Sequence, residues 1–91
     1  MIYIDPPRPY PRYGLCSHLM SDLPGEEGHA ELMAFAKRLG HKPQWLQHAG
    51  TYREHFDVMR SRIEVAKRLG AVEVPTQRIV EMMHAKRQVP A

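Results

Sequence analysis

The chain has 91 residues, which is enough for one domain with a modest hydrophobic core. Its 43 % hydrophobic and 25 % charged residues are typical of a globular domain and argue against a disordered, fibrous or membrane-spanning protein. The single cysteine, Cys16, excludes an internal disulfide and every multi-cysteine metal motif, so we expect a protein of the reducing cytoplasm.

The net charge of +3 is distributed unevenly along the chain. Residues 1–31 carry two arginines against five acids, whereas residues 32–91 carry eleven bases against five acids. Most of these bases lie where helices are expected to end, and cations at that position complement the helix dipole. Because no basic run with interleaved aromatic residues is present, we do not expect nucleic-acid binding.

The first half of the chain predicts a strand, a loop, one undecided segment and a helix. Residues 2–4 are typical of a short strand, which the prolines after Asp5 bring to an end. Residues 6–14 are rich in Pro and Tyr and predict a stiff, extended loop, and residues 15–23 fit a short strand or a short helix equally well. Residues 26–39 have apolar positions at helical spacing and end at Gly40, which favours a helix.

The second half predicts two more strands and two more helices. Residues 44–48 after Pro43 are a plausible second strand, and residues 49–54 form a loop. A second helix is expected over residues 58–69, a third strand over 71–74 and a final helix over 77–87, which Thr76 can cap. The pentapeptide Ala-Lys-Arg-Leu-Gly occurs at 36–40 and again at 66–70, in both cases where a helix is expected to end.

This alternation predicts an α/β fold: one compact domain over residues 1–91, with a small, mostly parallel three-stranded sheet flanked by about three helices. In such a sheet, ligands bind beyond the carboxyl ends of the strands. Asp5 ends the first predicted strand and is therefore either a functional carboxylate or a residue that caps its own loop.

Two further His and Asp pairs are candidate site residues. On a helix, His18 and Asp22 would share a face, as a His–carboxylate pair or as two metal ligands. On an extended chain, His55 and Asp57 would point to the same side and Phe56 to the core, although Asp57 also suits the N-cap of the second helix. Arg60 and Arg62 lie near the start of that helix, which is unfavourable for the dipole and hints at an anionic ligand.

These motifs resemble a family of small bacterial and phage proteins known as domain of unknown function 4031. The resemblance covers Tyr3 to about Val80 and rests on the strand ending in Asp5, on Ser-His-Leu-x-Ser-Asp at 17–22, on His-aromatic-Asp at 55–57 and on Leu-Gly-Ala-Val at 69–72. The chain departs from the pattern at Cys16, where Trp is frequent, and in a longer stretch over residues 47–54. The resemblance implies that Asp5, His18, Asp22, His55 and Asp57 act as a set, and it implies no activity.

Three functional hypotheses follow. The first is a polar His/Asp-lined cleft that binds a small phosphorylated or nucleotide-like anionic ligand, for example a signal nucleotide sequestered by a phage protein. The second is a phosphoester hydrolase in which the same Asp and His residues hold a divalent metal ion. The third is a protein-interaction module without a small-molecule site. No membrane partner is expected, and the open edges of a small sheet are compatible with a homodimer.

Overall fold

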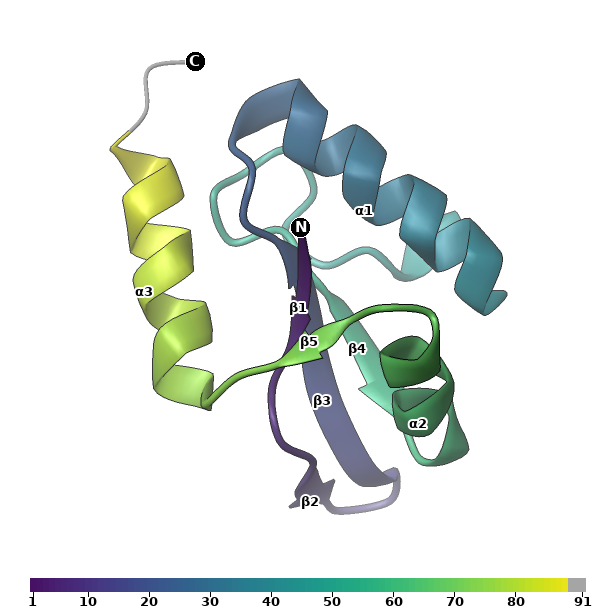
Figure 1. The fold of residues 1–91 in the computed structure, drawn as a ribbon. Coiled ribbons are helices and arrows are strands. Elements are labelled where there is room, and N and C mark those ends of the chain that lie inside the picture. The colour runs from purple at the N-terminus through teal and green to yellow at the C-terminus, as the bar shows by residue number, and fades with distance from the viewer. Residues whose placement is uncertain (89–91) are drawn as a thin grey trace.

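In the computed structural model, which describes residues 1–88, a mixed five-stranded sheet lies between helices (Figure 1). The elements in chain order are β1 (Ile2–Ile4), β2 (Arg8–Tyr10), β3 (Gly14–Ser21), α1 (Gly25–Leu39), the 3-10 turn η1 (Pro43–Trp45), β4 (Phe56–Met59), α2 (Ser61–Arg68), β5 (Val72–Glu73) and α3 (Thr76–Arg87). Residues 89–91 of the predicted domain lie outside the described residues. Within residues 1–88, no helix combines the length and the apolar character that crossing a membrane requires.

The strand β3 organises the sheet, because it pairs with three other strands. It is antiparallel to β1, β2 and β4, and the only parallel pair among the described residues joins β1 to β5. Leu19 pairs with Ile4 of β1 and also with Phe56 of β4, so these two strands flank β3 on opposite sides. The fold is therefore α/β as predicted, but the expectation of a mostly parallel, three-stranded sheet is wrong.

The strands β1 and β2 lie end to end along one side of β3, and Asp5, Pro6 and Pro7 separate them. Pro6 and Pro7 have no N–H group and cannot continue the ladder of hydrogen bonds. The predicted Pro/Tyr-rich loop at 6–14 thus contains a short edge strand and the turn into β3. This interruption leaves the Asp5 side chain beside the middle of β3.

The helices cover the two faces of the sheet unequally (Figure 1). On one face, α1 and α2 pack on the side chains of β1, β3 and β4; this core contains Ile2, Ile4, Leu19, Leu32, Phe35, Ala36, Leu39, Phe56, Val58, Ile63, Ala66 and Ala71. On the other face, α3 packs through Ile79 and Met82 against Met20 of β3, with Tyr3 beside them. That second face also carries the polar side chains of His18 and Asp57.

Two predicted elements are corrected by the structure. Residues 44–48 do not form a strand: they contain η1 and a single bridge from Gln47 to His55. Asp57 does not cap a helix, because it lies inside β4, and the N-cap of α2 is Arg60. The undecided segment 15–23 is mostly strand, as β3.

Candidate functional site

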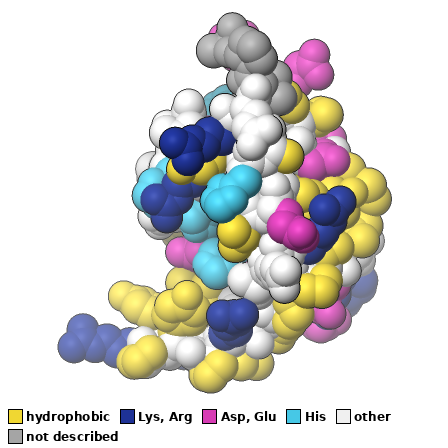
Figure 2. Space-filling view, turned by 90° about the vertical axis from the view of Figure 1, so that its left-hand side faces the viewer, with side chains coloured by type: hydrophobic (Ala, Val, Ile, Leu, Met, Phe, Trp, Pro, Cys, Tyr) yellow, Lys and Arg dark blue, Asp and Glu magenta, His cyan; other side chains and the backbone are white. Residues whose placement is uncertain are grey.

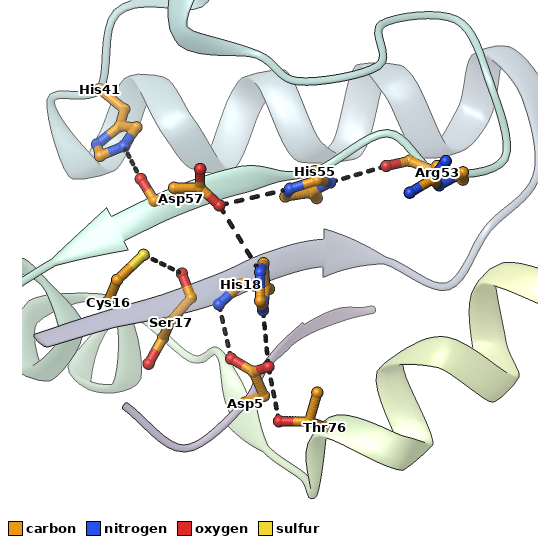
Figure 3. Close-up of polar contacts among 9 residues, drawn as sticks. All are labelled: Asp5, Cys16, Ser17, His18, His41, Arg53, His55, Asp57 and Thr76. Carbon is orange, nitrogen blue, oxygen red and sulfur yellow. Dashed lines mark hydrogen bonds and ion pairs between the residues drawn. The ribbon is translucent and has the colours of Figure 1, made fainter. Parts of the chain in front are cut away.

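The candidate site lies on the second face of the sheet, next to the beginning of α3 (Figure 3). Side chains alternate along a strand, so His18 points to the same face as Met20, away from buried Leu19. In β4, Phe56 and Val58 are buried in the core, which turns Asp57 to the polar face. His18 and Asp57 are register partners in the β3–β4 ladder, so their side chains lie next to each other.

Asp5 holds His18 through both carboxylate oxygens. Oδ1 accepts the backbone N–H of His18 at 2.6 Å, and Oδ2 lies 2.8 Å from Nδ1 of the His18 ring. The backbone N–H of Asp5 in turn donates to the His18 carbonyl at 3.2 Å. In the hydrogen-bond ladder between the strands, the Asp5 carboxylate thereby accepts the N–H that a backbone carbonyl would otherwise accept, next to the prolines that interrupt the ladder. The same carboxylate fixes the orientation of the His18 ring.

The imidazoles of His18 and His55 and the carboxylate of Asp57 converge at one point on this face. Oδ1 of Asp57 lies 3.4 Å from Nε2 of His55 and 3.9 Å from Nε2 of His18. One ligand atom from each of these three residues lies within 4.8 Å of the other two. Ligands of a common zinc ion, each about 2.0–2.1 Å from the metal, are about 3.3 Å apart, so a small closure would bring all three onto one ion.

The Nδ1 atom of each histidine is already engaged on the side away from this point. A carbonyl or carboxylate oxygen only accepts hydrogen bonds, so Nδ1 of His18 donates to Asp5, and Nδ1 of His55 donates to the Arg53 carbonyl at 2.8 Å. In the neutral rings, both Nε2 atoms therefore carry a lone pair. The two lone pairs and the Asp57 carboxylate form a set of three acceptors that face one another.

The charges of the cluster shift the pKa of three of its groups. The hydrogen bond to Asp5 raises the pKa of His18, and this effect outweighs the burial of the ring. Burial alone would raise the pKa of Asp5, but the hydrogen bonds from His18 and Thr76 together lower it. The neighbouring imidazole of His55, when it is protonated, lowers the pKa of Asp57. Without a bound cation, a proton on His18 is thus stabilised between two carboxylates.

Other side chains of the polar face surround the cluster. The charge of Arg8, on the edge strand β2, opposes protonation of His18. The centre of the His48 ring lies 5.9 Å from the centre of the His55 ring. The backbone of His48 has a positive φ of 51°. Cys16 is buried close to the cluster, and burial together with the charges of Asp57 and Asp5 raises its pKa to about 11. Histidine side chains gather beside Lys and Arg side chains on the face shown in Figure 2.

The structure brings Asp5, His18, His55 and Asp57 together, but it does not bring the other three predicted residues to them. Asp22 lies beyond the end of β3, where its Oδ1 is 2.8 Å from the N-terminal amino group. The Nε of Arg60 donates to the Tyr13 carbonyl at 3.0 Å. Arg62 donates to the Leu39 carbonyl and thereby satisfies the C-terminal end of α1.

Two residues that support the cluster were not predicted for this role. Thr76, expected to cap the last helix, makes no cap hydrogen bond and instead donates through Oγ1 to Asp5 at 2.9 Å. His41 is buried, and its Nε2 lies 3.0 Å from the Asp57 carbonyl. Neither contact leaves a sequence pattern, because each joins residues that only the tertiary fold brings together.

Comparison with known proteins identifies the family of this chain. The model of the family described as "Protein of unknown function (DUF4031)" matches residues 2–86, which is nearly the whole chain. The protein therefore belongs to this family, and the resemblance stated from the sequence is confirmed. Neither a comparison with curated proteins nor one with solved structures finds a significant match.

Proposed function

We propose that the protein binds a divalent transition-metal ion through His18, His55 and Asp57 and hydrolyses a small anionic ester, of the phosphoester class, at that metal. The single observation that carries this proposal is the set of three facing acceptors, whose ligand atoms lie within 4.8 Å of one another. Two imidazoles and one carboxylate are a ligand set that zinc and non-haem iron use.

The contacts around the three ligands also support a metal site. Histidines that bind metals usually donate their second ring N–H to a carboxylate or a carbonyl, which fixes the ring and raises its basicity. Here, the carboxylate of Asp5 has this role for His18, and the carbonyl of Arg53 has it for His55. His41 donates to the backbone of the third ligand, Asp57.

The exposure of the ligands supports catalysis rather than a closed structural site. The side chains of His18, His55 and Asp57 are 26 %, 14 % and 33 % exposed, so an ion held there would have open coordination positions. A metal of this kind lowers the pKa of bound water to about 7 and supplies a hydroxide nucleophile. Its oxygen would form the new bond to phosphorus while the bond to the ester oxygen breaks, and the departing alkoxide would take up a proton from solvent. The exposed Arg8 of the edge strand β2 would add positive charge for an anionic substrate.

Binding of an anionic ligand without turnover is the second candidate. The raised pKa of His18 favours this function, since a protonated imidazole between Asp5 and Asp57 can donate to an anion from an exposed face. In that case, the site would work without metal. The interaction-module hypothesis gains no specific support from the cluster.

The test is a titration of chelator-treated protein with Zn²⁺, followed by native mass spectrometry and calorimetry. We expect one ion per chain for the wild-type protein and none for His55→Ala, with both proteins folded by circular dichroism. His84→Ala, on α3 and outside the cluster, is the matched control and should bind one ion. Hydrolysis of bis(p-nitrophenyl) phosphate should require both Zn²⁺ and His55. Stoichiometric metal without hydrolysis would refute the hydrolase part of the proposal. The absence of bound metal would refute the metal site and would favour the metal-free ligand-binding function.

A further inference from the structure

A cavity lies away from the His/Asp cluster, between the beginning of α1, the loop over residues 50–54 and the end of α3. Its volume is about 650 Å³, which is within the range of small-molecule sites. None of the three proposed metal ligands lines it. Any ligand of this cavity would therefore be bound by different residues.

A buried carboxylate, that of Glu54, lines the cavity. Its side chain is 7 % exposed, and its Oε2 accepts the N–H of Gly50 at 2.8 Å and lies 2.9 Å from Nδ1 of His29. These two contacts fix the carboxylate, and Oε1 makes no hydrogen bond within residues 1–88. A fixed, nearly buried acceptor of this kind suits a ligand that brings hydroxyl donors, as a ribose does.

Two other walls of the cavity carry donors that suit an anionic group of a ligand. The side chain of Lys86 is half-buried, and its ammonium group donates one hydrogen bond, to the Ser21 carbonyl at 2.9 Å, which leaves two N–H donors. The helix α1 has 15 residues and begins at this cavity with no side-chain cap, so the N–H groups of its first turn are available as donors. The same turn carries the carboxylates of Glu26 and Glu27, so the positive charge that a phosphate needs comes from Lys86, and α1 contributes N–H donors only.

The third wall is formed by the planar groups of Tyr52 and Arg87. The guanidinium of Arg87 lies 5.5 Å from the centre of the Tyr52 ring, and both residues line the cavity. Aromatic rings and guanidinium planes are the surfaces on which nucleobases stack. The hydroxyl acceptor, the phosphate donors and the stacking surface occur in one cavity.

We propose that this cavity binds a ribonucleoside monophosphate, with its sugar hydroxyls on Glu54, its phosphate on Lys86 and the first turn of α1, and its base against Tyr52 and Arg87. This inference is independent of the proposed metal site. A single loop links the two sites, because Glu54 precedes the proposed ligand His55 directly.

The experiment is calorimetric titration of metal-free, full-length protein with adenosine monophosphate. We expect saturable one-to-one binding, and affinities at least about tenfold lower for adenosine, for inorganic phosphate and for 2′-deoxyadenosine monophosphate, since each lacks a contact to a charged group. Equal affinity for inorganic phosphate would overturn the proposal in favour of a simple anion site. The absence of binding at millimolar nucleotide would also overturn it.

Variants assign the contacts. Lys86→Met should lower the affinity for adenosine monophosphate about tenfold and leave that for adenosine unchanged. Lys37→Met, at the other end of α1, is the matched control and should bind as the wild type does. Glu54→Gln should weaken both ligands; if that variant does not fold, the comparison of ribose with deoxyribose on the wild-type protein tests the same contact. His55→Ala should still bind the nucleotide, so failure of the metal site and failure of this site are distinguishable.

Discussion

Thr76 Oγ1 donates a hydrogen bond of 2.9 Å to Oδ2 of Asp5, across 71 residues of sequence. This bond joins the first residue of α3 to the carboxylate that fixes His18. The last helix thereby reaches the metal site proposed here without contributing a ligand to it. A weaker docking of α3 would therefore remove one of the hydrogen bonds that hold the Asp5 carboxylate against His18.

The first prediction concerns this support of His18. Asp5→Asn should lower the affinity for Zn²⁺ by about 10–100-fold, the usual effect of replacing an outer-shell partner of a metal-bound histidine. Thr76→Val should lower it by a smaller factor, up to about tenfold, because Asp5 keeps its bonds to His18. Thr76→Ser keeps the hydroxyl and should restore the affinity. Calorimetry with Zn²⁺ measures all three.

A purely structural role of Asp5 and Thr76 would give a different result. In that case, Thr76→Val would lower the melting temperature but leave the affinity of the folded protein for Zn²⁺ unchanged. Asp22→Asn is the matched carboxylate control, because Asp22 contacts the N-terminal amino group rather than His18. It should bind Zn²⁺ as tightly as the wild type does.

The second prediction concerns the pH dependence of stability in metal-free protein. The pKa of His18 is raised above its ordinary value of 6.5 in the folded state, so its contribution is complete below pH 6.5 and is lost as the pH rises through the folded pKa. The pKa of Asp5 is lowered below 3.8, so its contribution is present above pH 3.8 and is lost as the pH falls through the folded pKa. The pair should therefore contribute most near pH 5.

Urea unfolding of the wild type and Asp5→Asn at several pH values measures this contribution. Asp5 is only 1 % exposed, and replacing it leaves buried donors of His18 and Thr76 poorly paired, which should cost about 1–3 kcal/mol near pH 5. The difference between the two proteins should become smaller in alkaline solution. In NMR titrations, the pKa of His18 should fall in Asp5→Asn and stay unchanged in Asp22→Asn. A difference in stability that is constant with pH would contradict the linkage.

The helix ends were predictable from the sequence, because they depend on local geometry. The helix predicted at 26–39 is α1, and its buried residues include the predicted apolar positions Leu32, Phe35 and Leu39. Both copies of Ala-Lys-Arg-Leu-Gly end a helix: Gly40 and Gly70 have φ of 80° and 114°. In both copies, the N–H of the following residue donates to the carbonyl of the alanine.

The sheet was not predictable to the same extent, because strand pairing is a long-range property. The sequence of β3 mixes polar and apolar residues because both of its faces do: Ser17 and Ser21 are buried on the side of Leu19, and His18 lies between Cys16 and Met20 on the other side. The strand β4 has only four residues, and Asp57 in its middle resembles a helix cap in sequence. The expected strand at 44–48 fails, because its residues form η1 and the single Gln47 bridge instead of a ladder.

The candidate site was predicted only in part, because it also depends on contacts between distant segments of the chain. His55 and Asp57 point to one side of an extended segment, as their spacing indicates, while Phe56 is fully buried on the other. The assumption that His18 and Asp22 share a helical face fails, because β3 is a strand and Asp22 lies beyond its end. The role of Thr76 depends on a contact between the two ends of the chain, which no local pattern encodes.

The third prediction concerns the reactivity of Cys16, the only thiol of the chain. Burial, and then the charges of Asp57 and Asp5, raise its pKa from 9.0 to about 11, so at pH 8 its thiolate fraction is about 100-fold below that of an ordinary cysteine. Alkylation by iodoacetamide should therefore be at least about 100-fold slower in the folded protein than in urea. Mass spectrometry of timed samples measures both rates. Asp57→Asn removes only the Asp57 part of the smaller, electrostatic cause and should accelerate the reaction far less than unfolding does. Equal rates in the folded and unfolded chains would show that Cys16 is an accessible nucleophile beside His18 and would place it among the candidate catalytic groups.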